Sequence, residues 1–126
     1  MESFMASKEC RMVGKGYCPC PLEDVAEALS RKWTLTILVT IGNFDKLRFN
    51  DLHARIGKIT PKTLADRLKG LEAMALIRRK AYNEIPPRVE YSLTSKGRKL
   101  RHAVIPLMRW AAKQKSSTPQ QVSQLM

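Results

Sequence analysis

The sequence has little of what marks secreted, membrane or disordered proteins. Its 126 residues include three cysteines, an odd number that does not make the disulfide framework of a small secreted domain. The longest apolar run, around residues 35–41, contains threonines and is too short to cross a bilayer. No basic start leads into an apolar signal segment, so we expect a cytoplasmic protein of one domain.

Motifs for catalysis are also absent. The sequence has no glycine-rich phosphate loop, no nucleophile elbow and no metal-ligand helix, so we expect neither an enzyme nor a cofactor. Aromatic residues make up 6% of the chain, which disfavours an RNA-binding module with an exposed stacking platform.

Positive charge, in contrast, is abundant and unevenly distributed. The chain has 23 Lys and Arg against 11 Asp and Glu, a net charge of +12. Residues 1–53 are neutral, whereas residues 54–101 carry 13 basic and 4 acidic side chains. A field concentrated in one stretch predicts a polyanionic partner, either nucleic acid or an anionic membrane. The excess does not lie on one basic amphipathic helix, so double-stranded DNA is favoured and no membrane partner is expected.

Hydrophobic spacing predicts a mainly α-helical domain with a small β-hairpin, an α+β fold. Residues 1–19 show no sustained period and are expected to form an arm, and the polar residues 116–126 a flexible tail. The domain between them, 20–115, ends in a helix that Thr94 caps, that is bent at Pro106 and that runs through Ala111. The other helices are expected over residues 21–30, 32–40, 49–56 and 61–74.

The helix over 61–74 has the strongest signals. Thr60 suits the N-cap, Pro61 suits the first helical position, and three leucines at i, i+4 and i+7 make an apolar face. The opposite face and its flank carry polar side chains: Lys62, Thr63, Asp66, Arg67 and Lys69. These side chains are either a DNA-contacting surface or a solvated face on which Lys62 and Asp66 pair across one turn.

A hairpin follows this helix. Val89, Tyr91 and Leu93 alternate with polar residues, which indicates a half-buried strand, and residues 76–82 are its expected partner. The tip is residues 83–87, stiffened by two prolines. Placing Tyr82 opposite Arg88 aligns the apolar faces of the two strands but leaves Arg79 on the inner side, an inconsistency of this register.

The order of elements describes a winged helix-turn-helix. Two short helices joined near Gly57 precede a hairpin with basic residues, and the second helix has an apolar face for the core and an outer face of donors. Its N-terminus offers backbone N–H groups to phosphate. Lys58, Lys62, Arg67 and Lys69 supply cations, and Thr60 and Thr63 supply hydroxyl donors.

The sequence resembles the HxlR family of winged helix-turn-helix transcriptional regulators, which are MarR-like, from about Cys20 to Trp110. The resemblance rests on motifs that are specific only in combination. These are residues 20–23 (CPLE), 31–35 (RKWTL), 48–52 (RFNDL), 60–64 (TPKTL), 67–68 (RL), 71–72 (LE), 86–94 (PPRVEYSLT) and Gly97.

The resemblance implies a homodimer joined by terminal helices, with the helix at 61–74 in the major groove and the wing at 83–87 near the adjacent minor groove. Thr60, Lys62, Thr63 and Arg67 would then lie at the groove, and Lys58 and Lys69 at its phosphate rim. Lys80, Asn83 and Arg88 would be wing contacts, and Lys32 would hold a phosphate. Pro106 departs from the family pattern, in which a proline often comes about one turn earlier.

Some members of this family sense oxidants or electrophiles through a cysteine at the position of Cys20. A cysteine at the N-cap before Pro21 has its thiolate stabilised by helix N–H groups, although nearby carboxylates oppose this. Cys18 and Cys10 could resolve a sulfenic acid at Cys20. The spacing Cys10-x7-Cys18-x-Cys20 lacks the two-residue loop of common zinc sites, so no metal is expected.

The function predicted is that of a dimeric, sequence-specific transcriptional regulator with an unidentified small-molecule or oxidant effector. The alternative is an architectural protein that coats DNA through phosphate contacts with little sequence specificity. The two differ in the ratio of operator affinity to random-duplex affinity, which is typically about 10³ or more for specific binders.

Overall fold

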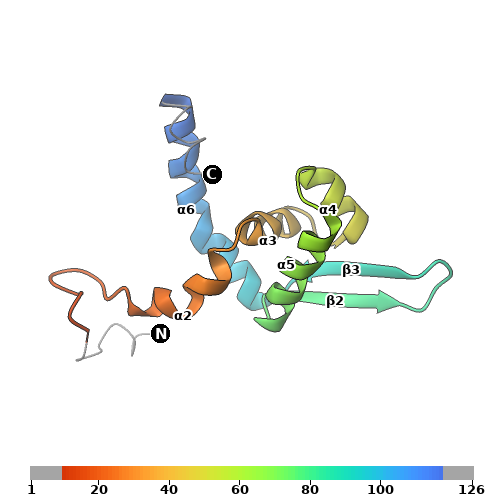
Figure 1. Ribbon diagram of the computed structural model, residues 1–126, viewed down its shortest axis with the longest axis horizontal. Coiled ribbons are helices and arrows are strands. Elements are labelled where there is room, and N and C mark those ends of the chain that lie inside the picture. Colours follow the sequence, from red (N-terminus) through yellow and green to blue (C-terminus); the bar gives the residue numbers. More distant parts are fainter. Residues whose placement is uncertain (1–9, 118–126) are drawn as a thin grey trace.

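The computed structural model describes residues 10–117, which form five α-helices and three β-strands (Figure 1). The expected arm residues 1–9 and tail residues 118–126 lie outside the described part. In chain order the elements are α2 (Cys20–Leu29), α3 (Thr34–Asn43), β1 (Leu47–Arg48), α4 (Phe49–Ile56), α5 (Pro61–Ala73), β2 (Ile77–Tyr82), β3 (Arg88–Leu93) and α6 (Ser95–Ser117).

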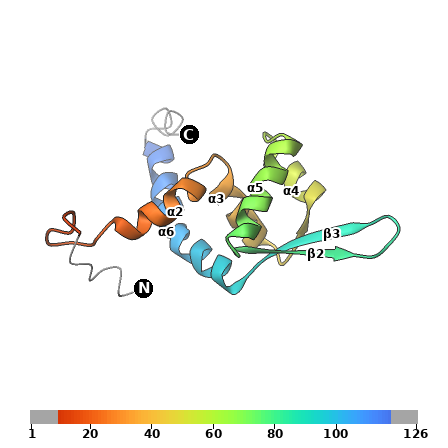
Figure 2. The ribbon, with the colours of Figure 1, turned by 60° about the horizontal axis from the view of Figure 1, so that its bottom comes forward.

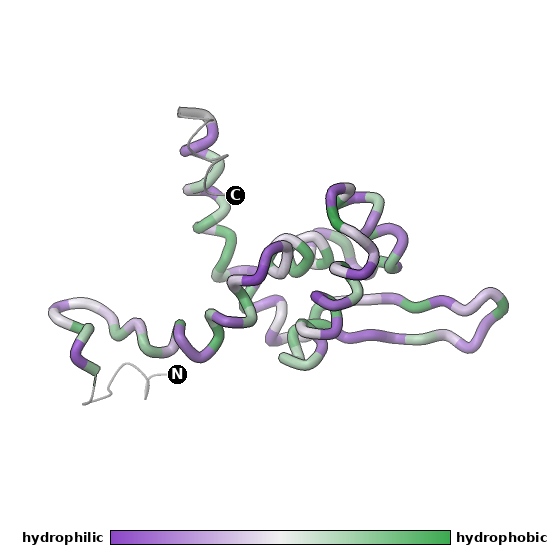
Figure 3. Tube along the Cα trace, viewed as in Figure 1, coloured by the Kyte–Doolittle hydropathy of each residue, from purple (hydrophilic) through white to green (hydrophobic). Residues whose placement is uncertain are grey.

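One hydrophobic core joins α3, α4, α5 and the sheet. The three leucines predicted to form the apolar face of α5, Leu64, Leu68 and Leu71, are all buried, which confirms the predicted orientation of that helix. They belong to one cluster with Ile37, Leu38, Ile41, Leu47, Leu52, Ile59, Leu76, Ile77, Tyr91 and Leu93. Figure 3 shows that hydrophobic segments also occur on α6, away from this core.

The sheet has three antiparallel strands in the order β1-β3-β2, so the expectation of a two-stranded hairpin was incomplete. The predicted register is confirmed, with Tyr82 opposite Arg88 and Ile77 opposite Leu93. The missed strand, β1, is two residues long and pairs Leu47 with Tyr91. A segment this short has no alternation of polar and apolar residues for a sequence pattern to detect.

Helix boundaries differ from those expected at α2 and α5 by one residue, and by more at α3, which ends at Asn43, and at α6. The helix predicted over 32–40 is α3, which begins at Thr34 because Trp33 has a left-handed backbone with φ of 80°. At the other end of the chain, α6 continues through Pro106 to Ser117, beyond the predicted domain limit at residue 115. Among residues 10–117, no helix has the length and apolar character needed to span a membrane.

Hydrogen bonds and close packing hold the N-terminus of α6 against the body. The Thr94 hydroxyl accepts a hydrogen bond from the Gly97 N–H at 3.0 Å, which confirms the predicted cap, and donates to the Ala75 carbonyl at 2.6 Å. A Cβ atom at Gly97 would overlap the carbonyl oxygen of Leu76, so α6 approaches the strand as closely as only glycine allows. We refer to the β2–β3 hairpin as the wing. It projects from the body, and so do α2 and the C-terminal half of α6, each in a different direction (Figures 1 and 2).

Candidate nucleic-acid interface

The pair α4 and α5 has helix-turn-helix geometry. Gly57, with φ of 79°, ends α4, and buried Ile59 anchors the turn to the core. Thr60 caps α5 as predicted, because its Oγ1 accepts from the Thr63 N–H at 3.1 Å. Its hydroxyl also donates to Thr63 Oγ1 at 2.9 Å, which leaves the Thr63 hydroxyl hydrogen available to another acceptor. The exposed N-terminal turn of α5 therefore presents donors to solvent.

Two lysines dominate the outer face of α5. Lys62 and Lys69 are exposed and line one shallow groove together with Thr63 and Ala65. Asp66 lies in the same groove, and its carboxylate contacts Arg67 at 2.7 Å and Arg31 at 3.9 Å. Because those guanidinium groups compensate the carboxylate, the face remains net positive. The predicted pairing of Lys62 with Asp66 is not among the ion pairs formed.

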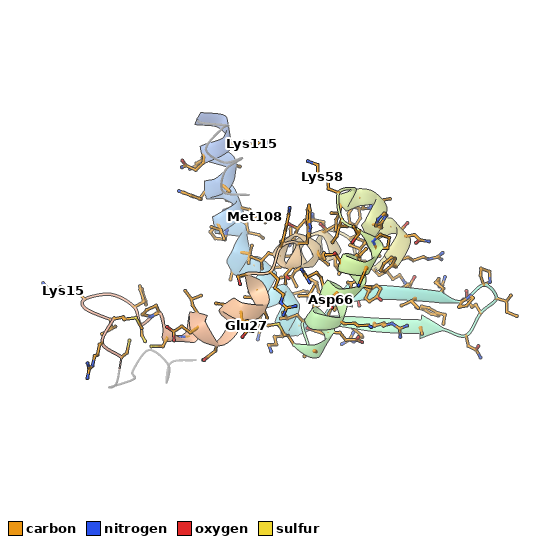
Figure 4. The ribbon with its side chains drawn as sticks, in the orientation of Figure 1. Lys15, Glu27, Lys58, Asp66, Met108 and Lys115 are labelled. Carbon is orange, nitrogen blue, oxygen red and sulfur yellow. The ribbon has the colours of Figure 1, made fainter. Side chains whose placement is uncertain are left out.

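The side chain of Arg67 is less available for DNA contact than the sequence predicted. Its side chain is 19% exposed, and its Nε donates to the Lys32 carbonyl at 2.9 Å. This bond holds the turn before α3 against α5, so it brings Lys32 to the edge of the same surface. The ammonium of Lys32 lies 5.1 Å from the centre of the Trp33 ring and remains exposed. Lys58, in the turn before α5, also points away from the body (Figure 4).

On the outer face of the wing, Arg88 is paired with acidic residues. Arg88 contacts Glu84 at 3.2 Å and Glu90 at 4.0 Å, and its guanidinium stacks 4.0 Å from the Tyr82 ring. The ammonium of Lys80 lies 5.0 Å from the centre of the same ring. A hydrogen bond from Tyr82, followed by nearby cations, lowers the pKa of Glu90. Lys80 and Arg88 therefore share one face, and Arg88 is paired there with acidic residues.

The inner face of the wing carries a cation that sequence reasoning did not assign. Arg79 pairs with Tyr91 across the sheet, yet it is exposed and lines a hollow with Lys69 and Glu72 of α5. Arg79 therefore lies on the inner side, as the register predicts, but beside a buried core residue, Tyr91. Its side chain reaches the solvent-exposed hollow next to α5, so this face joins α5 to the wing.

At its tip the wing exposes Asn83 and Ile85. We call the polar side chains that α5, its flanking turns and the wing present to solvent the α5–wing surface. It consists of Lys32, Lys58, Lys62, Thr63, Lys69, Arg79 and Asn83.

The three cysteines cluster at the start of α2. Cys20 is the first residue of the helix, and Pro19 occupies the N-cap, so the expected N-cap position of Cys20 was wrong by one residue. The Cys10 Sγ lies 2.7 Å from Cys18 Sγ and 3.5 Å from Cys20 Sγ. Hydrogen bonds with Cys18 and Cys10 raise the pKa of Cys20 to about 12, whereas the bond with Cys18 lowers the pKa of Cys10. Cys10 is therefore the thiol that ionises more readily, and the stabilised thiolate expected at Cys20 is not found.

An apolar surface lies where α6 leaves the body. A groove between α3 and α6 is lined by Leu35, Val39, Val104, Leu107 and other apolar side chains. Leu107 and Trp110 are about half exposed, at 54% and 52%. Exposed apolar patches of this kind commonly mark association surfaces.

Comparison with known proteins identifies the same fold. Residues 28–119 match the model of the HxlR-like helix-turn-helix family. An uncharacterized HTH-type transcriptional regulator of Halalkalibacterium halodurans is 41% identical over 97 residues, which cover 77% of this chain and 86% of the relative.

Two solved structures are also similar. The reduced form of the redox regulator HypR has a TM-score of 0.72 and 30% identity, covering 79% of this chain and 98% of HypR. The reduced transcriptional regulator YodB of Bacillus subtilis has a TM-score of 0.65 and 29% identity, covering 79% of this chain and 94% of YodB.

Proposed function

Because the chain belongs to the HxlR-like helix-turn-helix family and is a transcriptional regulator of winged helix-turn-helix type, we propose that it acts as a homodimer that binds specific DNA sequences. The observation that carries this proposal is the α5–wing surface. Exposed cations and a capped helix N-terminus lie on α5, and Lys69 and Arg79 connect this helix to the wing through one hollow. A duplex carries phosphates along both edges of its groove, which suits such a continuous cationic surface.

Within this proposal, the first turn of α5 enters the major groove. Lys62 and Thr63 have side-chain donors that can reach base edges, whereas Lys58 and Lys69 contact phosphates at the rim. The Thr60 hydroxyl is engaged by Thr63 and holds the N-terminus of α5 in place. Arg67 fixes the turn that carries Lys32, which itself binds phosphate.

The wing is proposed to approach the neighbouring minor groove through its tip and its inner face. Asn83 and Arg79 make the direct contacts. Lys80 and Arg88 stack on Tyr82 and give the hairpin its shape, with Lys80 close enough to the edge to contact phosphate as well.

The homodimer is proposed to form through α6. Its exposed Leu107, Met108 and Trp110 project beyond the body of one chain, and a second copy would cover them together with the groove between α3 and α6. Such an arrangement would hold two α5–wing surfaces on one duplex.

Selection of bound fragments from genomic DNA, followed by footprinting, tests sequence specificity. We expect an operator bound about 10³-fold or more tightly than a random duplex of equal length at the same salt concentration. The footprint should show two half-sites. A ratio near one would instead support the architectural alternative, in which only phosphates are contacted.

Lysine substitutions test the placement of the surface. Lys62→Ala should weaken operator binding by about 1–3 kcal/mol and relax the sequence preference at one base position, because a base-edge contact is lost. Lys115→Ala makes the same charge change at the far end of α6 (Figure 4) and should leave affinity unchanged. Arg67→Ala should also weaken binding, through the loosened Lys32 turn. Unchanged affinity in both Lys62→Ala and Arg67→Ala would remove the groove assignment.

A second proposal is that oxidants regulate DNA binding through Cys20 and its two neighbours, which the likeness to the redox regulator HypR favours. Peroxide would oxidise the Cys10 thiolate to a sulfenic acid with release of hydroxide, and the Cys20 thiol would attack that sulfur, losing its proton and releasing water, to form a disulfide. We expect peroxide to change the DNA affinity of the wild type but not of Cys20→Ser. An equal response of both proteins would exclude Cys20.

A further inference from the structure

We propose that Cys10, Cys18 and Cys20 form a three-thiolate site for a soft, thiophilic metal ion of the Zn²⁺ and Cd²⁺ type. Their three Sγ atoms lie within 4.8 Å of one another, at the junction of the arm and α2. Thiolate sulfur is the side-chain ligand with the strongest preference for such ions. This inference does not depend on DNA binding.

Packing alone does not account for the convergence of the three sulfurs. Among residues 10–29, Cys18 is the only buried residue, and α2 buries no side chain in the core. The segment also projects away from the body (Figure 1). Burial of apolar surface therefore contributes little here, and hydrogen bonds between thiols are weak. A metal ion that binds all three sulfurs would supply the missing stabilisation, as structural metals do in small domains.

The backbone around the cluster is arranged as a ligand loop. Gly14 has a left-handed backbone with φ of 49°, and the Gly16 N–H donates to the Val13 carbonyl at 2.7 Å, so the segment between Cys10 and Cys18 turns back on itself. The N–H of Cys20 donates to Cys18 Sγ at 3.4 Å. Hydrogen bonds from the backbone to a ligating sulfur orient it and stabilise its charged form.

Ligand chemistry points in the same direction. Metal ions bind the deprotonated thiolate, and three thiolates within 4.8 Å of one another would repel each other without a cation between them. A divalent cation between the sulfurs would offset the repulsion that prevents several of them from ionising together. Binding should therefore release protons from the thiols that are neutral in the metal-free protein.

The donor set limits the kind of ion. The group contains sulfur only, and no His, Asp or Glu of the described residues joins it. Hard cations such as Mg²⁺ and Ca²⁺ prefer oxygen ligands and should not bind. Zn²⁺ favours four ligands, so three cysteines would leave one position for water or an external thiol.

Titration of the reduced, metal-stripped full-length chain with Cd²⁺ tests the site. We expect a thiolate-to-metal charge-transfer band that saturates at one ion per chain, loses intensity on competition with Zn²⁺ and is unchanged by Mg²⁺. Saturation should protect all three thiols from alkylation. Each of Cys10→Ser, Cys18→Ser and Cys20→Ser should weaken Cd²⁺ affinity at least tenfold. The double variant His53→Ala with His102→Ala removes both histidines of the chain and should bind as the wild type does.

Absence of the band, or an affinity that no cysteine substitution changes, would overturn the proposal. A disulfide between Cys10 and Cys18 that forms in air, together with no metal uptake by the reduced chain, would likewise overturn it and identify the cluster as a redox pair only. Operator binding by each cysteine variant reports whether the body is folded. Failure of the metal site with intact operator binding would leave the proposed regulator function standing.

Discussion

The segment from α3 to β3 and the segment from Cys10 to Leu29 are held in place by different means. The first buries thirteen apolar side chains in one core. The second buries Cys18 alone, and at the end of α2 the partly buried Leu29 packs against that core. Hydrophobic burial therefore fixes the DNA-binding body. The N-terminal segment is instead held by contacts among its three cysteine sulfurs and by a few backbone hydrogen bonds.

The difference separates two roles within one short chain. A rigid core holds the α5–wing surface in a fixed geometry, which groove recognition requires. Segments with few buried contacts open at low free-energy cost and are suited to respond to effectors. The projecting half of α6 belongs with the second class, because Leu107 and Trp110 remain about half exposed.

Truncating a leucine in each region gives the largest expected contrast. Leu64→Ala removes a fully buried side chain from α5 and should lower the free energy of unfolding by about 2–5 kcal/mol. Leu22→Ala, on α2, removes a side chain that is 66% exposed and should change it by less than about 0.5 kcal/mol. Urea unfolding measures both. Similar losses would contradict the view that only the body depends on burial.

A pair of glycines sharpens the comparison within the body. Gly97→Ala places a Cβ atom against the Leu76 carbonyl and should destabilise the fold by about 1–3 kcal/mol. Gly70→Ala lies on α5 with no atom near the added Cβ, so it should stabilise by up to about 1 kcal/mol through helix propensity. Thermal unfolding compares the two variants, and destabilisation by both would show that the surface of α5 is more crowded than described.

Charge on α6 tests its assignment to association rather than to the body. Leu107→Glu should weaken dimerisation by about tenfold or more, since it places a carboxylate in an apolar contact. The unfolding of the monomer should hardly change, because Leu107 is half exposed. Sedimentation at several concentrations measures the dissociation constant. A dimer unaffected by this substitution would place the interface elsewhere.

The smallest effect concerns acid stability at the wing. The pKa of Glu90 is lowered in the folded chain by Tyr82 and by neighbouring cations, so the ionised side chain stabilises the fold above its unfolded pKa. This contribution is lost as the pH falls from about 4.3 through the lower folded-state pKa. Glu90→Gln should therefore show a shallower loss of Tm over that range than the wild type. Identical profiles would mean that the cluster around Tyr82 contributes nothing.

Much of the body could be predicted from the sequence because its signals are periodic and local. The leucines of α5, its Thr60 cap and the hairpin register all follow from spacing and residue type. Strand β1 was missed because two residues carry no period. The inner position of Arg79 was predicted, but its exposure there could not be, because the space between the wing and α5 depends on tertiary packing.

The sequence also did not show which individual cations are available for DNA contact. Arg67 and Arg88 carry the same charge as the exposed lysines, yet Arg67 is bonded to the distant Lys32 carbonyl and Arg88 stacks on Tyr82 of the neighbouring strand. The convergence of three cysteines likewise depends on a turn at Gly14 that spacing alone does not specify. The predicted site and the observed surface therefore differ in which side chains are engaged by partners, and not in secondary structure.

Amide hydrogen exchange of the full chain with and without its selected operator tests the central claim most directly. The account predicts that DNA slows exchange in residues 58–69 and 79–88 of the same molecule, with little change in residues 10–29. Slower exchange confined to α2 and α6, with α5 and the wing unaffected, would contradict it.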